Sequence, residues 1–165
     1  MNSFKIRAIE PKDNSEVAVV IRKVLVEMGV PKVGTTYEDK SLDDMYSYYD
    51  HPAMQYFVVE ENEHIIGCAG IAPLPPETEV CELQKMYFLP EARGRGIGAQ
   101  MMTSCLNFAN KAGYKRCYLE TMPYMEQAKK LYARSGFEPL DGPMGDTGHY
   151  NCSVWMIRSL EDYNS

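Results

Sequence analysis

The stretch RGRGIG at residues 93–98 carries the residue types with the clearest chemical use in this chain. Glycines allow consecutive backbone N–H groups to face one concavity, and the first turn of a following helix adds unpaired N–H donors at the positive end of its dipole. A phosphate group suits such a concavity. Arg93 and Arg95 would add positive charge beside it. We therefore predict a phosphate-binding turn, whereas the alternative is a tight strand-to-helix turn with two solvated arginines.

The spacing of the glycines argues against the two commonest nucleotide-binding loops. No lysine follows Gly98, as the P-loop pattern GxxxxGK would require. Gly94, Gly96 and Gly98 are evenly spaced and Ala99 follows them, which departs from the GxGxxG pattern of dinucleotide-binding proteins. A different phosphate compound is therefore expected.

The glycine stretch resembles the pyrophosphate-binding signature of the GNAT superfamily of N-acetyltransferases, which reads Arg or Gln, x, x, Gly, x, Gly or Ala. Arg93, Gly96 and Gly98 match this signature. Residues 86–90 (MYFLP) are similar to the strand and proline that precede it in the family. Residues 131–137 (LYARSGF) are similar to the family's LYxxxGF segment.

The resemblance, which covers Glu79 to Phe137, implies the GNAT fold. This is an α/β fold with a central twisted mixed sheet of six to seven strands, flanked by about four helices. Two neighbouring parallel strands splay apart in it and form a slot for the cofactor. The rest of the chain agrees with this fold in the order of its elements, since GNAT domains begin with a strand, two helices and a hairpin.

The resemblance also implies acetyl-CoA as the cosubstrate, and no metal. The pantetheine arm would pair with the backbone of the strand before the glycine turn, much as an added strand would. The implied cofactor-binding residues are Met86, Tyr87, Phe88, Arg93, Gly94, Arg95, Gly96, Ile97, Gly98 and Ala99. One position departs from the family, because Met125 stands where many members carry an asparagine that bonds the cofactor arm. Lys129, Lys130 and Arg134 are left out of the site, since three basic residues on a helix usually form a solvated face.

Amine acetylation needs a base for the amine, a donor for the thioester carbonyl and an acid for the departing thiolate. Tyr132 matches the family tyrosine that lies near the thioester sulfur and acts as general acid. A phenol has a pKa of about 10 and is protonated at neutral pH.

The base has two candidates between which the sequence does not decide. Glu82 occupies the strand position that holds a base glutamate in some family members, and Glu120 occupies the corresponding place on the next strand in others. Two parallel neighbouring strands could bring both carboxylates to the splayed end, although either could be only a solvated or salt-bridged group. His149, in a glycine-rich loop, is a third candidate.

Hydrophobic periodicity predicts the elements that position these residues. Strands are expected at residues 4–9, 55–60, 65–72, 80–89, 115–121 and 151–157, with a further strand near Phe137. Helices are expected from Asp13 to Met28, from Leu42 to Tyr49, at 97–112 and at 124–135. The glycine turn thus lies between a strand and a helix.

The composition predicts one globular domain that spans residues 1–165, with 45% hydrophobic and 24% charged residues. A net charge of −6 without blocks of Lys or Arg argues against nucleic-acid binding. No apolar run reaches the roughly 18 residues of a membrane span and no secretory signal opens the chain, so a cytoplasmic protein without membrane association is expected. The cysteines are scattered among apolar neighbours, which predicts reduced core thiols instead of disulfides or zinc ligands. They are Cys68, Cys81, Cys105, Cys117 and Cys152.

The acceptor is expected opposite the cofactor, beside the loop at 29–40 and a helix that carries Tyr46, Tyr48 and Tyr49. An acidic protein with aromatic side chains there suits a small cationic amine, whereas a tyrosine-rich helix also suits a core or a homodimer contact. Amino acid, polyamine, aminoglycoside and protein N-terminus all stay open as acceptors.

The prediction from the sequence is an N-acetyltransferase that moves the acetyl group of acetyl-CoA to a primary amine of a small molecule or peptide. The amine would attack directly in a ternary complex. The alternative is a non-catalytic acyl-CoA-binding or sensing module, and a purely structural domain would bind no CoA.

Overall fold

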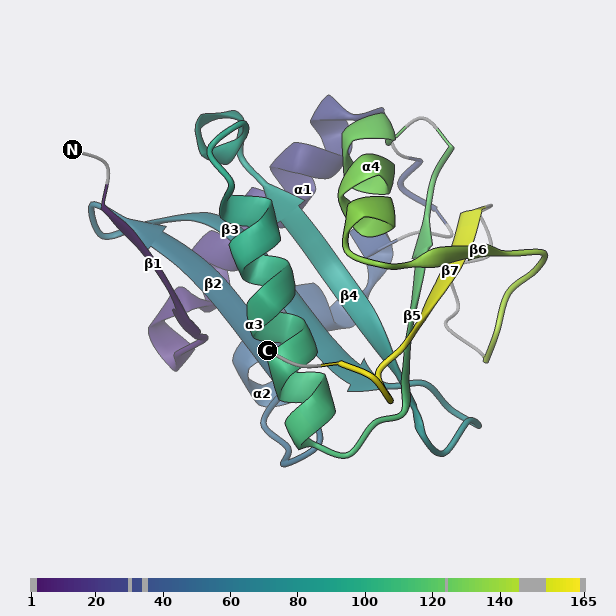
Figure 1. Cartoon of the computed structure of the whole chain (residues 1–165). Helices are drawn as coiled ribbons and strands as arrows, with labels where there is room; N and C mark the ends of the chain where they lie inside the picture. Colours follow the sequence, from purple (N-terminus) through teal and green to yellow (C-terminus); the bar gives the residue numbers. More distant parts are fainter. Residues whose placement is uncertain (1–2, 30, 34–35, 124, 146–153, 164–165) are drawn as a thin grey trace.

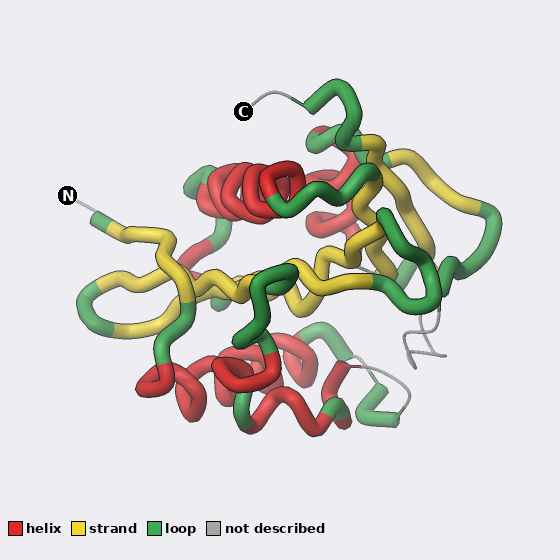
Figure 2. Tube along the Cα trace, turned by 90° about the horizontal axis from the view of Figure 1, so that it is seen from below, coloured by secondary structure: helices red, strands yellow, loops and turns green. Residues whose placement is uncertain are grey.

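The computed structural model describes residues 3–29, 31–33, 36–123, 125–145 and 154–163. A mixed β-sheet forms its middle layer, with α1 and α2 on one face and α3 and α4 on the other (Figures 1 and 2). The seven strands lie in the order β1-β2-β3-β4-β5-β7-β6. Their bounds are β1 Phe4–Ala8, β2 Gln55–Glu61, β3 His64–Pro73, β4 Val80–Phe88, β5 Arg116–Thr121, β6 Glu138–Leu140 and β7 Val154–Ser159. This arrangement confirms the predicted fold class, including the extra strand near Phe137.

The strand β3 lies at the centre of the core. Eight consecutive residues, 65–72, are buried, because helices cover both faces of the sheet at this strand. Two glycines in β3 make room for aromatic rings. A Cβ atom on Gly67 would lie 2.4 Å from Cδ1 of Phe88, and one on Gly70 would lie 2.4 Å from Cδ1 of Tyr56. The continuous apolar run at 65–72 is therefore explained by burial of this strand on both faces of the sheet.

The helices follow the predicted apolar stripes. Helix α1 spans Asn14–Glu27, after the 3-10 turn η1 Pro11–Asp13, and helix α3 spans Ile97–Lys111. On α1, the buried residues Val17, Val20, Ile21, Val24 and Leu25 recur at the spacing of one helix face. Helix α4 spans Glu126–Arg134. Of the segment predicted as this helix, Tyr124 lies outside the described residues, as do positions 151–153 of the last predicted strand.

The predicted helix from Leu42 to Tyr49 is in fact two short elements, the 3-10 turn η3 Lys40–Asp43 and the single-turn helix α2 Met45–Tyr48. Asp44 separates them, with a φ of −148° and a ψ of 65° that no helix allows. Its side chain accepts a hydrogen bond from the backbone N–H of Ser47 and so caps α2. The apolar spacing was read correctly, but the capping residue inside it was missed.

The parallel strands β4 and β5 pair over only part of their length. The registered pairs are Val80 with Arg116, Cys81 with Cys117, and Glu82 with Tyr118. Beyond Glu82, β4 continues to Phe88 without further pairs to β5, although both strands are described in full. The predicted splay of two parallel neighbours is therefore present.

A bulge interrupts β4 just beyond the point where the splay begins. Its pairing with β3 shifts between Cys68 and Gly70, so that Lys85 and Met86 fall between the paired residues Gln84 and Tyr87. Lys85 has a φ of 51°, in the left-handed region that side chains other than glycine rarely adopt. Bulges of this kind redirect side chains and often lie beside active sites.

Four cysteines of the described chain, Cys68, Cys81, Cys105 and Cys117, are buried free thiols. Cys152 lies outside the described residues. None of the described helices is long and apolar enough to cross a membrane.

Candidate active site

A cavity of about 530 Å³ opens between the splayed part of β4, the turn before α3, and α4, mainly on the α3/α4 face of the sheet, and reaches the end of α1. Ten residues singled out in the sequence line it. They are Met86, Tyr87, Phe88, Arg93, Gly94, Gly96, Ile97, Gly98, Ala99 and Tyr132. The resemblance thus identified residues that the fold brings around one space.

The glycine turn has the backbone geometry of an anion cradle. Gly94 and Gly96 have φ values of 72° and 77°, and Gly96 is the N-cap of α3. Gly98 is needed for close packing, since a Cβ atom there would lie 3.0 Å from Cδ2 of Leu131 on α4. The free N–H groups at the start of the 15-residue helix α3 therefore open toward the cavity.

The two arginines of the turn are held by carboxylates. Arg93 donates two hydrogen bonds of 2.9 Å to Glu27 and others to the backbone oxygen of Phe88. Arg95 donates bonds of 2.6 and 3.2 Å to Glu61 and does not line the cavity. Of the two, Arg93 lines the cavity, whereas the side chain of Arg95 is held by Glu61 outside the lining.

Helix α4 supplies the opposite wall of the cavity. Tyr132 is 7% exposed, and burial raises the pKa of its phenol well above the ordinary value. Met125, the N-cap of α4, accepts a contact of 3.6 Å from Oγ1 of Thr121 and packs against the core. Where many family members carry an asparagine, this chain therefore has an apolar lining residue.

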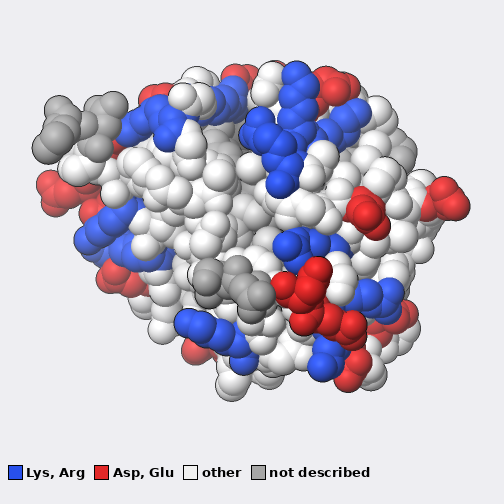
Figure 3. Space-filling model, viewed as in Figure 1, with Lys and Arg blue, Asp and Glu red and all other residues white. Residues whose placement is uncertain are grey.

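Sequence reasoning missed part of the lining. Arg134 lines the cavity, although the basic residues of α4 were interpreted as a solvated face. Figure 3 shows Lys and Arg side chains gathered over α4. The α1 residues Val24 and Met28 also line the cavity. Their contribution could not be read from the sequence, since Met28 and Val24 lie 65 and 69 residues before Arg93, where the glycine turn begins.

Glu82 belongs to the opposite face of the sheet. It is 4% exposed, and its Oε1 accepts a hydrogen bond of 2.6 Å from Nε2 of Gln84. Oε1 of Gln84 in turn accepts a bond of 2.5 Å from the hydroxyl of Tyr49, at the end of α2. Glu82 therefore lies under the α1/α2 layer and does not line the cavity.

Glu120 lies on the same face, one strand further along. Its Oε2 accepts a hydrogen bond of 2.7 Å from the hydroxyl of Tyr118, which accepts one from the backbone N–H of Met144. Tyr118 is the registered partner of Glu82. Burial and then the Glu120 hydrogen bond raise the pKa of Tyr118. Glu120 thus lies two residues beyond the last β4–β5 pair, on the face of the sheet that carries Glu82. His149 lies outside the described residues.

A model of the Acetyltransferase (GNAT) family matches residues 24–137, which is more than half of the chain. The chain belongs to the GNAT family. A protein called "Uncharacterized N-acetyltransferase YjgM", from Escherichia coli strain K12, is 43% identical to this GNAT chain over 157 residues, or 94% of each chain.

Solved GNAT structures agree with this fold. An acetyltransferase of the GNAT family from Staphylococcus aureus Mu50 superposes with a TM-score of 0.84 at 18% identity, over 96% of this chain and all of the other. The paia N-acetyltransferase from Thermoplasma acidophilum, solved in complex with coenzyme A, superposes with a TM-score of 0.76 at 17% identity, over 95% and 99% of the two chains.

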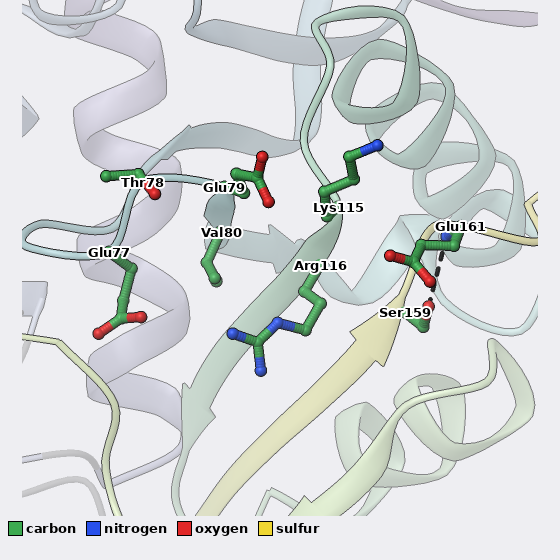
Figure 4. Close-up of a pocket in the computed structure, with 8 residues that line it drawn as sticks. All are labelled: Glu77, Thr78, Glu79, Val80, Lys115, Arg116, Ser159 and Glu161. Carbon is green, nitrogen blue, oxygen red and sulfur yellow. Dashed lines mark hydrogen bonds between the residues drawn. The ribbon is translucent and has the colours of Figure 1, made fainter.

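A smaller pocket of about 260 Å³ lies at the end of β4 and β5 away from the splay (Figure 4). Its lining mixes three glutamates with Lys115 and Arg116. Nothing in this mixture selects one sign of charge. Within the described part of the chain, no group of three or more His, Cys, Asp or Glu side chains gathers to hold a metal ion.

Proposed function

We propose that this GNAT protein transfers the acetyl group of acetyl-CoA to a primary amine of a small molecule or peptide, by direct attack in a ternary complex. The observation that carries the proposal is the early end of β4–β5 pairing at Glu82 and Tyr118. It leaves an opening in the sheet, with a glycine cradle on one face and a buried carboxylate on the other.

The residues of the α3/α4 face fit the cosubstrate. The backbone N–H groups around Gly96 and the start of α3 would bind the pyrophosphate, and Arg134 would add positive charge. The backbone of Met86 to Phe88 would bond the amides of the pantetheine arm. Acetyl-CoA supplies an activated thioester to this site.

Three groups of the chain would share the chemistry. Glu82 accepts a proton from the amine as it attacks the thioester carbon, and the N–H of Met86 polarises the carbonyl oxygen. Tyr132 donates its proton to the sulfur as the carbon–sulfur bond breaks. A raised pKa keeps Tyr132 protonated until that moment. Base and acid approach the reacting carbon from opposite faces of the sheet.

The proposal is tested by calorimetry with acetyl-CoA and CoA, followed by an assay of thiol release with a panel of amines. We expect micromolar binding and amine-dependent release of CoA. No binding at millimolar acetyl-CoA would overturn the proposal. Binding without any stimulation by amines would instead favour the non-catalytic acyl-CoA-binding module.

The substitution Tyr132→Phe separates chemistry from binding. We expect turnover to fall at least tenfold, with acetyl-CoA affinity nearly unchanged. Tyr114→Phe is the matched control, because Tyr114 is also a buried tyrosine but donates its hydroxyl to the backbone of Ala53 and does not line the cavity. Equal turnover in the two variants would remove Tyr132 from the mechanism.

A further inference from the structure

A second large cavity, of about 640 Å³, lies on the α1/α2 face at the level of the bulge. Its lining is polar and consists of Asp39, Lys40, Ser41, Asp44, Ser47, Tyr48, Gln84 and Lys85. Gln84 is the residue that bonds Glu82. The cavity therefore adjoins the proposed base, on the face opposite the cosubstrate, where an acceptor would enter.

Lys85 is the unusual member of this lining. Its side chain is only 4% exposed, although lysine is among the residues least often buried. Strand alternation alone would turn Lys85 away from Gln84, but the bulge at Lys85 directs both side chains to the same cavity. The fold thus keeps a cation in a place where its desolvation is costly.

The surroundings of Lys85 leave its ammonium group able to take a further partner. Nζ lies 3.5 Å from Oδ2 of Asp39, longer than the roughly 2.7–2.9 Å of a strong charge-assisted hydrogen bond. The rings of Tyr48 and Tyr49 lie 5.5 and 6.0 Å from Nζ, at cation–π distance. An ammonium has three N–H donors, so it can hold Asp39 and a second acceptor together.

The lining as a whole is balanced, with two aspartates, Asp39 and Asp44, and two lysines, Lys40 and Lys85, so the preference for a carboxylate as that second acceptor comes from the placement of Lys85 beside Gln84 and the proposed base. Oδ1 of Asp44 accepts hydrogen bonds from two neutral groups, the N–H of Ser47 and Nδ2 of Asn14, and this carboxylate lies in the lining with Asp39. Lys40 adds a second cation to the lining. A polyamine or another purely cationic acceptor would meet Lys85 as a like charge, whereas a zwitterion would meet Lys85 with one end and Glu82 with the other.

We propose that the acceptor belongs to the amino-acid class and that Lys85 binds its carboxylate while its amine lies toward Glu82. This inference rests on the proposed function and names its substrate class.

Matched pairs of amines test the proposal on the unaltered protein. Tyrosine and tyramine, histidine and histamine, and lysine and cadaverine differ only in the carboxylate. We expect kcat/KM to be at least tenfold higher for the best amino acid than for its decarboxylated partner. Equal or better use of the decarboxylated amines, or acetylation of none of the amino acids by a protein that binds acetyl-CoA, would overturn it.

Variants of Lys85 provide the second test. Lys85→Met should raise KM for the amino acid at least tenfold and change kcat/KM for the decarboxylated amine less than threefold, whereas Lys85→Arg should retain part of the preference. Lys115→Met is the control, since it removes the same charge just before β5 begins, beside the smaller pocket and away from the splay (Figure 4). An equal loss for both amines of a pair in Lys85→Met would overturn the assignment.

The same experiments distinguish failure of this inference from failure of the proposed function. Calorimetry with acetyl-CoA reports on the α3/α4 face, which Lys85 does not line. If acetyl-CoA binds and amines are acetylated without any preference for a carboxylate, only the assignment of Lys85 fails. If acetyl-CoA does not bind, the proposed function fails with it.

Discussion

The two faces of the sheet differ in the kinds of groups that line their cavities. On the α3/α4 face, backbone groups and glycines form the cradle, and the arginines Arg93 and Arg95 are held by Glu27 and Glu61. On the α1/α2 face, charged and aromatic side chains such as Lys85 form the lining. One face therefore depends on backbone conformation, and the other on the identity of its side chains.

This difference indicates which face could change its ligand specificity through single side-chain substitutions. A backbone cradle binds any ligand with the right phosphate geometry and depends on few side chains. A lining of charged side chains selects by sign of charge and by position, so a single substitution can alter the preferred ligand. The following variants separate the two faces.

The largest loss of CoA affinity is expected from a substitution in the glycine turn, at Gly96. Gly96→Glu places a side chain at a φ of 77° and a negative charge where phosphates would bind. We expect affinity for CoA, measured by calorimetry, to fall at least about a hundredfold. Gly113→Glu is the control, because Gly113 has a φ of 94° and open space around its Cβ position but lies at the other end of α3. Similar CoA affinity in both variants would contradict the cradle.

Stability of the α1/α2 layer is tested at Asp13, a buried carboxylate with a structural partner. Arg7 bonds it at 2.8 and 3.0 Å, and the N–H of Glu10 bonds it at 2.8 Å. Asp13→Asn should lower the free energy of unfolding by about 2 kcal/mol, or about thirtyfold in the unfolding equilibrium, because it removes the buried negative charge that Arg7 bonds twice and leaves Arg7 with Glu60 and Glu10 only. The effect is measured by urea denaturation.

The pH dependence of this loss follows from the pKa of Asp13. Burial opposes ionisation, but Arg7 and the N–H of Glu10 outweigh it, so the folded pKa is lowered. Stability from this group is then present above its unfolded pKa of about 3.9 and is lost as the pH falls through the folded pKa. The deficit of Asp13→Asn should be full near pH 7 and shrink toward pH 3. Asp43→Asn, at an exposed pair with Arg22, should have little effect at either pH.

The two candidate bases are compared by Glu82→Gln and Glu120→Gln. Glu82 is the more buried and adjoins the polar cavity of the α1/α2 face through Gln84. We expect Glu82→Gln to lower kcat about tenfold or more at neutral pH with CoA affinity unchanged, and Glu120→Gln to have a smaller effect. Profiles of rate against pH measure the loss. A larger effect at Glu120 would reverse the assignment.

The smallest change in CoA affinity is expected from Arg134, with Arg95 as the comparison. Arg134 lines the cavity, whereas Arg95 is turned toward Glu61. Arg134→Gln should weaken CoA binding about threefold at low salt, and less at high salt because exposed charges are screened. Arg95→Gln should leave CoA affinity nearly unchanged. The opposite ranking in calorimetry would mean that Arg95 leaves Glu61 when the ligand binds.

Much of the α3/α4 face could be predicted from the sequence, because its determinants are local. The glycine turn, the helix that follows it and the segment around Tyr132 are each read within a few residues. The position of the Arg95 side chain could not be predicted, since its partner Glu61 is 34 residues away.

The α1/α2 face was harder to predict. Strand periodicity gives no indication of the bulge at Lys85, and without it Lys85 and Gln84 would face opposite sides. Asp44 ended one short element and capped the next, where the apolar spacing alone indicated one helix. In both places one departure from regular backbone geometry, which hydrophobic periodicity does not reveal, places residues in the lining of the polar cavity on this face.

The burial of the cysteines protects them from a by-product of the proposed reaction, since acetyl transfer would release the free thiol of CoA at every turnover. Thiol–disulfide exchange requires a thiolate, and burial raises the pKa of Cys68 to about 12 and those of Cys81 and Cys105 well above the ordinary value. Cys117 is equally enclosed. These four side chains are therefore shielded from mixed disulfides with oxidised CoA, and the core keeps its packing when the redox balance of the surroundings changes.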